Sequence, residues 1–150
     1  MSDFFFPKYT LKTKNESNKT LVYDELRNIW IQLTPEEKVR QHLWKFLNKE
    51  FDYPKGLMKI EKKILVNKLE KRFDLLIYGK SGTPLLIAEC KAPNIALDKK
   101  TLEQVLRYNI KLKATYLLIT NGIELFCCEI DFKSGKLSFL KKIPNFTDIC

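Results

Sequence analysis

Apolar and polar residues repeat along the chain with two different periods, which separates helices from strands. Residues 35–50 carry apolar side chains at spacings of three and four, and residues 98–113 repeat this pattern, so we expect two helices that each bury one face. Residues 57–66 alternate instead, and residues 72–78 and 85–91 are apolar runs of strand length. The pattern predicts the order helix, three strands, helix, strands.

Local signals mark the ends of several of these elements. Thr34 precedes Pro35, and Glu37 follows three residues after the threonine, which predicts a capped helix start at this point. Thr101 and Gln104 have the same spacing, so Gln104 is expected to close a second capping box. The second helix has an expected core stripe of Leu102, Val105, Leu106 and Ile110.

The last third of the chain predicts further strands. Residues 116–120 form a continuous apolar run, which is typical of a strand buried on both faces. Turns at 121–122 and 134–135 separate it from expected strands at 124–130 and near 136–141.

The first 20 residues lack a sustained period and are expected to form an N-terminal arm. Residues 22–23 and 30–33 flank a polar segment and predict a small hairpin. We find no linker or repeat after this point, so residues 21–150 are expected to form a single domain.

Composition adds a charge argument. The net charge of +9 makes an anionic partner plausible. No apolar run reaches the roughly 20 residues that a membrane span needs, so no membrane partner is expected. The basic residues are densest in the segment that holds Lys55, Lys59, Lys62, Lys63, Lys68, Lys71 and Arg72.

The four cysteines form no C-x-x-C pair, and the neighbouring Cys127 and Cys128 should point to opposite faces of a strand. We therefore expect reduced thiols in a cytoplasmic protein. His42 is the single histidine. A single histidine excludes a histidine-rich metal site, and we expect it on the helix surface or at an interface.

Asp74 and Glu89 are the most informative polar residues, because each interrupts an apolar strand. The turn-forming residues 79–82 lie between their strands, which predicts a hairpin. A register with Asp74 opposite Ile87 places Glu89 diagonally across, roughly 7–8 Å away on the same face, with Lys91 beside it. Two carboxylates at this distance can share a hard cation.

Each candidate residue also has a purely structural interpretation. Asp74 and Glu89 could be strand-end acids that pair with neighbouring basic side chains. Gln104 and Tyr108 lie one helical turn apart and could serve only as cap and core residues, and Glu37 could serve only as a cap residue.

The set of motifs resembles the PD-(D/E)xK nuclease superfamily, and within it the N-terminal nuclease domain of type I restriction enzyme R subunits. The resemblance spans about residues 21–145. It rests on segments 35–41, 72–74, 88–93, 104–108 and 120–122.

The resemblance implies a restriction-endonuclease-like α/β (α+β) core, with a central mixed sheet flanked by helices. It implies Mg²⁺, with Mn²⁺ as an alternative, held by Asp74, Glu89 and the carbonyl of Cys90. The catalytic set implied for DNA phosphodiester hydrolysis is Asp74, Glu89, Lys91, Gln104 and Glu37. Residues expected to contact nucleic acid are Tyr108, Lys62, Lys63 and Arg72.

The chain departs from the family pattern in two respects. Phe73 stands where the superfamily name has proline. The family's translocating motor is also absent, so separate motor or specificity subunits are expected partners, and an oligomer is possible. Two rival hypotheses remain: a catalytically weak nucleic-acid-binding or complex-forming module that keeps the nuclease fold, and a structural adaptor.

Overall fold

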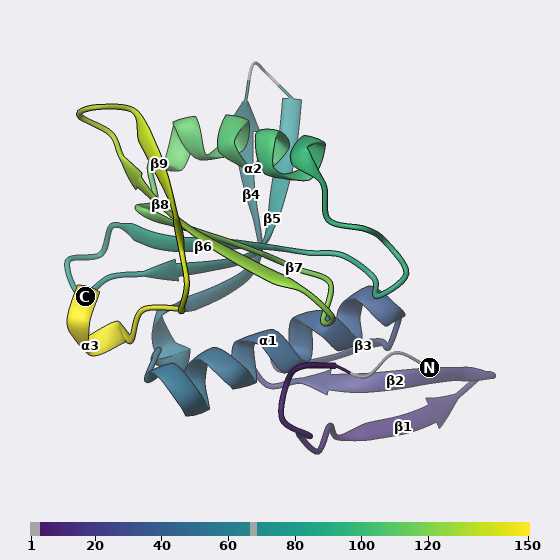
Figure 1. The fold of residues 1–150 in the computed structure, drawn as a ribbon. Coiled ribbons are helices and arrows are strands. Elements are labelled where there is room, and N and C mark those ends of the chain that lie inside the picture. Colours follow the sequence, from purple (N-terminus) through teal and green to yellow (C-terminus); the bar gives the residue numbers. More distant parts are fainter. Residues whose placement is uncertain (1–3, 67–68) are drawn as a thin grey trace.

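A six-stranded sheet forms the centre of the molecule, with a long helix on each face (Figure 1). The computed structural model describes residues 4–66 and 69–150, apart from the side chains of residues 61–72. Along the sheet, all neighbouring strands are antiparallel except β6 and β7. The sheet is therefore mixed, as expected. In spatial order its strands are β4 (Met58–Val66), β5 (Leu69–Tyr78), β6 (Pro84–Cys90), β7 (Tyr116–Thr120), β8 (Leu125–Asp131) and β9 (Lys136–Leu140).

Helix α1 (Pro35–Phe51) begins where its sequence signals place it. The Thr34 hydroxyl accepts a hydrogen bond from the Glu37 N–H at 3.1 Å, and Pro35 occupies the first turn, where its missing N–H costs nothing. The apolar side chains of α1 are buried at Val39, Leu43, Trp44 and Leu47, whereas Phe46 is only partly covered. These contacts attach α1 to one face of the sheet.

Helix α2 (Lys99–Leu112) covers the other face and provides the crossover that the parallel strands β6 and β7 require. Its cap is Asp98, whose carboxylate accepts from the Thr101 N–H at 2.9 Å, so the capping box expected at Thr101 and Gln104 is wrong. Ile110 is also misplaced in the expected core stripe, because it is 70% exposed. Asn109 is buried instead, and its amide exchanges two hydrogen bonds with the backbone of Ala114.

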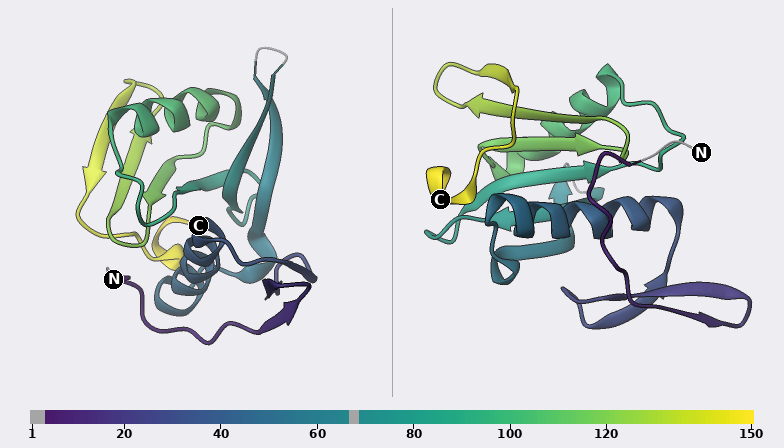
Figure 2. Two further views of the ribbon diagram at one scale, coloured as in Figure 1. Left: turned by 90° about the vertical axis from the view of Figure 1, so that its right-hand side faces the viewer. Right: turned by 60° about the horizontal axis from the view of Figure 1, so that its bottom comes forward.

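A separate three-stranded sheet lies beyond α1 (Figure 2). It consists of β1 (Thr13–Glu16), β2 (Lys19–Asp24) and β3 (Ile29–Gln32). The expected hairpin of β2 and β3 is confirmed, and β1 adds a strand from within the N-terminal arm. Two short elements were not predicted, the 3-10 turn η1 (Lys55–Leu57) and helix α3 (Phe146–Ile149).

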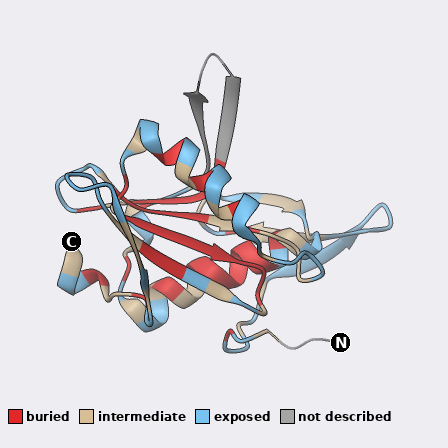
Figure 3. Ribbon diagram, turned by 45° about the horizontal axis from the view of Figure 1, so that its top comes forward, coloured by how far each residue is buried: buried red, intermediate tan, exposed pale blue. Residues whose placement is uncertain are grey.

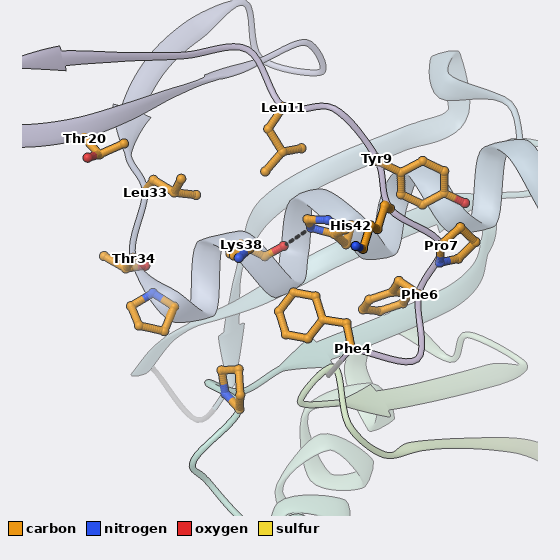
Figure 4. Close-up of a pocket in the computed structure, with 13 residues that line it drawn as sticks. Phe4, Phe6, Pro7, Tyr9, Leu11, Thr20, Leu33, Thr34, Lys38 and His42 are labelled. Carbon is orange, nitrogen blue, oxygen red and sulfur yellow. Dashed lines mark hydrogen bonds between the residues drawn. The ribbon is translucent and has the colours of Figure 1, made fainter. Parts of the chain in front are cut away.

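The start of the arm crosses α1 (Figure 4). The Phe5 N–H donates to the carbonyl of Gly122 at 2.9 Å, and Phe4 and Phe6 pack against His42. His42 is therefore only 6% exposed: it lies at the interface between the arm and the helix, one of the two expected positions, and not on the open helix surface. A cavity of about 1200 Å³ lies between the arm, α1 and the small sheet.

Two apolar layers hold the sheet and its helices together (Figure 3). One lies between α1 and the sheet, the other between α2 and the sheet. Cys127 belongs to the first layer and Cys128 to the second, as strand alternation predicts. All four cysteines are free thiols, and Cys150 alone is exposed. Within the described part of the chain, none of the helices combines the length and apolar character of a membrane span.

Candidate nuclease site

The candidate site begins where the pairing of β5 with β6 ends. Leu76 pairs with Ile87 and Leu75 pairs with Ala88, so Asp74 and Glu89 are the next residues in line. The expected register, which set Asp74 opposite Ile87, is wrong by two positions. The structure therefore brings the two carboxylates directly across from each other rather than diagonally.

The hairpin turn explains the difference in register. The Gly79 N–H donates to the Thr83 carbonyl at 2.9 Å, which keeps Thr83 in the turn, and Tyr78 pairs with Pro84. The register then shifts once more between Ile77 and Tyr78. Such an irregularity moves every later pair along the strand and leaves no clear mark in the sequence.

The Asp74 carboxylate is buried and held at both oxygens. Its Oδ1 accepts from Nη2 of Arg40 at 2.7 Å, and its Oδ2 accepts from the backbone N–H of Cys90 at 2.6 Å. Charge-assisted hydrogen bonds of this length strongly restrict a side chain. Asp74 thus presents a single orientation toward Glu89.

Glu89 lies in an environment that disfavours its charge. Burial and the nearby Asp74 carboxylate raise the pKa of Glu89 to about 8. Lys91 opposes this shift, with its Nζ 3.6 Å from Oε1 of Glu89. Protonation of Glu89 to its neutral form, or a bound cation, would relieve the repulsion between the two acids.

The first helix contributes two acids with different surroundings. Glu37, the acid expected from the sequence, is buried and pairs with Arg40, while its other oxygen accepts from the Gln41 amide at 3.0 Å. Burial and the charge of Asp74 raise the pKa of Glu36, while Arg40, 3.7 Å away, and Lys91 lower it. The family resemblance placed Glu37 in the catalytic set as an accessory acid, and nothing in the sequence pointed to Glu36.

Arg40 was also missed. Its guanidinium pairs with Glu37 one turn earlier on α1 and with Asp74 on β5, and Glu36 lies 3.7 Å away. Burial lowers the pKa of Arg40, but the charges of Asp74 and Glu37 outweigh this and raise it overall. The only sequence signal for Arg40 was that it follows Glu37 by three residues and Glu36 by four, a spacing that usually indicates solvated ion pairs on a helix.

Gln104 and Tyr108, expected at the same site, contact each other and the strand that carries Asp74. The Gln104 amide donates to the Tyr108 hydroxyl at 2.7 Å, and the Tyr108 ring contacts Phe73, the neighbour of Asp74, at 6.0 Å between centroids. This pair links α2 to the strand that carries the buried acid. The side chains of Lys62, Lys63 and Arg72, expected to contact nucleic acid, lie outside the described residues.

The donors present suit a hard divalent cation. Asp74 and Glu89 supply oxygens from two facing carboxylates, and the Cys90 carbonyl lies in the chain between Glu89 and Lys91. Burial holds the pKa of the Cys90 thiol well above its ordinary value, so the thiol stays neutral and its backbone is the available group. Among the described residues, no three acidic, histidine or cysteine side chains cluster as a metal site by themselves, so a carbonyl or water would have to complete the shell.

The mixed sheet, the helix on each face and the paired acids together define a restriction-endonuclease-like domain. The family described as the type I restriction enzyme R protein N terminus (HSDR_N) matches residues 35–144, and the chain belongs to this family.

Two solved structures share the fold. One is a fragment assigned as an HsdR subunit of a type I restriction enzyme from Vibrio vulnificus YJ016, with a TM-score of 0.54 and 18% identity over 78% of this chain. The present chain spans 24% of that fragment. The other is a protein assigned as a nuclease of the DUF820 group from Anabaena variabilis ATCC 29413, with a TM-score of 0.50 and 11% identity, covering 90% of this chain and 87% of that one. A comparison with curated proteins gave no match.

Proposed function

We propose that this domain hydrolyses DNA phosphodiester bonds with the help of Mg²⁺, or of Mn²⁺ in its place. The observation that carries the proposal is the facing pair of Asp74 and Glu89, with Lys91 3.6 Å from Glu89. Burial of two adjacent carboxylates is costly unless a cation or proton compensates them. Membership of the R-subunit family supports the same chemistry.

Asp74, Glu89 and the Cys90 carbonyl would hold the metal ion, which supplies charge neutralisation at the phosphate and a more acidic water. Lys91 would orient the attacking water and stabilise the negative charge that builds on the phosphate. Gln104 and Tyr108 would order the active site or the nucleic-acid backbone, and Lys62, Lys63 and Arg72 would contact that backbone. Glu37 acts on Asp74 through Arg40, whereas Glu36 is the acid poised to order a water.

DNA is the proposed substrate, and the family suggests that a separate motor or specificity subunit delivers it. The net charge of +9 favours attraction to the phosphate backbone. The cytoplasm is the proposed location, because DNA is there and the buried cysteines are free thiols.

Metal titration followed by plasmid cleavage tests the proposal. Asp74→Asn should lose both metal binding and cleavage, whereas Lys91→Gln should keep metal binding and lose cleavage by about a hundredfold or more. Lys99→Gln is the matched control, since its side chain is 89% exposed and it also removes one positive charge. Cleavage by the Asp74→Asn and Lys91→Gln variants at the rate of the Lys99→Gln control would disprove the proposed roles.

One observation favours the second candidate, a nucleic-acid-binding module with weak catalysis. Asp74 already has a protein cation, because Arg40 donates to it at 2.7 Å. Under this alternative the protein binds DNA without product at any Mg²⁺ or Mn²⁺ concentration, and Asp74→Asn leaves the affinity for DNA unchanged.

A further inference from the structure

A chain of alternating charges connects the N-terminal sheet to the candidate site. Asp24, at the end of β2 and fully buried, accepts from Nε of Arg27 at 2.5 Å. Nη2 of Arg27 lies 3.7 Å from Oε1 of Glu37, and the same Glu37 oxygen accepts from Nη1 of Arg40. Arg40 then donates to Asp74.

Each side chain in this series of ion pairs restrains the position of the next. Asp24 also accepts from the backbone N–H groups of Leu26 and Arg27, at 2.8 and 3.3 Å, so its orientation is set by the turn itself. Glu37 is anchored through its second oxygen by Gln41. A planar guanidinium held on one side by Glu37 can approach Asp74 in few ways.

This series of ion pairs ends at Asp74, the residue on which the proposed reaction depends. Arg40 fixes one oxygen of Asp74 and the Cys90 N–H fixes the other. Arg40 is 6% exposed, so water cannot easily substitute for it. Arg40 is held by Glu37, which Arg27 contacts in turn, and both Arg27 and its partner Asp24 precede the segment matched by the family.

We infer that Arg40 is a positioning residue for Asp74, and that Glu37 and Arg27 position Arg40 in turn, so that the N-terminal sheet helps to set the geometry of the nuclease site. The effect on catalysis rests on the proposed function. Arg40 does not contact the substrate, and the N-terminal sheet contributes to the orientation of Arg40 as well as to packing.

The test compares Arg40→Gln, Arg40→Lys and Glu37→Gln with Lys49→Gln, an exposed control on the same helix. At saturating DNA and metal, Arg40→Gln should lower kcat by roughly a hundredfold with little change in KM, because a small displacement of a reacting group is costly. Arg40→Lys should recover part of the rate. Glu37→Gln should have a smaller effect that disappears in the Arg40→Gln background, since Glu37 acts through Arg40.

A second readout does not require activity. The Cys90 amide proton reports the hydrogen bond to Asp74, and its NMR resonance should move upfield in Arg40→Gln and, by less, in Glu37→Gln and Arg27→Gln. The Lys49→Gln control should leave it in place. If the wild-type protein cleaves nothing, the proposed function fails and this resonance alone decides the inference; an unmoved Cys90 amide in folded Arg40→Gln and Arg27→Gln proteins overturns it.

Discussion

At the scale of single residues, Glu89 shows how the fold changes the chemistry of an ordinary side chain. In the sequence it is one acid in an apolar run, but in the structure it faces Asp74 and has little solvent to stabilise its charge. Burial and the facing Asp74 carboxylate raise the pKa of Glu89, which favours its protonated form. A metal ion that binds here would compete with that proton.

The raised pKa predicts a pH dependence of stability. Between the ordinary value of 4.5 and the folded value of about 8, the folded protein binds more protons than the unfolded chain, so the free energy of unfolding should fall as the pH rises through this window. Glu89→Gln should flatten the dependence of Tm on pH in this range. Saturating Mn²⁺ should raise the Tm of the wild-type protein more at pH 8 than at pH 6.

The control for this prediction is Glu124→Gln, which removes a single carboxylate elsewhere on the chain. If Glu89→Gln and Glu124→Gln both keep the wild-type slope of Tm against pH, Glu89 is not the group responsible. Calorimetry of Mn²⁺ binding in buffers of different ionisation enthalpy measures the released proton directly.

At the scale of elements, helix α1 and strand β7 were predictable because their signals are local. The cap at Thr34 lies within the helix sequence, and residues 116–120 are a continuous apolar run that became a strand with every residue buried. Helix α2 was predictable in span but not in orientation. Its exposed Ile110 and buried Asn109 depend on which face the sheet meets.

The turn after β7 makes an element-scale prediction. Gly122 has a φ of +87°, and a Cβ there would lie 2.7 Å from the ring of Phe4. Gly122→Ala should therefore lower the free energy of unfolding by about 1–3 kcal/mol, through backbone strain and displacement of the arm. Chemical denaturation of the two proteins measures this loss.

Gly135→Ala is the matched control, since Gly135 also has a positive φ, +73°, but an added Cβ meets nothing within 4 Å. It should lose only the strain component. The excess loss in Gly122→Ala should vanish when Phe4 is replaced by alanine, and equal losses at the two glycines in every background would show that the arm does not pack on the turn.

At the scale of the whole molecule, the site is a junction of separate parts. Strands β5 and β6 supply the facing acids, α1 supplies Arg40, which bonds Asp74, and α2 carries the Gln104 and Tyr108 pair proposed for the same site. The excess of positive charge belongs to the molecule as a whole and bears on how it would meet DNA.

If DNA is the partner, its affinity should fall steeply with salt, because each phosphate contact releases counterions with a slope of about −0.9 in log K against log salt. Replacing Lys62 and Lys63 together by glutamine should reduce the slope by roughly 2 if both contact phosphates. Fluorescence anisotropy with a labelled duplex over a salt series gives the slope.

The control is Lys133→Gln with Lys136→Gln, two exposed lysines around the β8–β9 turn, at the opposite side of the sheet from β4. A slope that changes equally in both pairs would indicate general attraction without a defined contact at Lys62 and Lys63.

The sequence by itself determined the order of the main helices and strands, the cap of α1 and the spacing of Asp74, Glu89 and Lys91, because these follow from patterns among residues close in the chain, and the family resemblance supplied the mixed sheet. Only the tertiary structure decided the register of β5 and β6, the approach of Arg40 to Asp74 and the pairing of Glu37 with Arg40. These features depend on a turn irregularity and on how a helix rotates against a sheet. Neither is encoded by a local pattern, since many distant side chains decide them together.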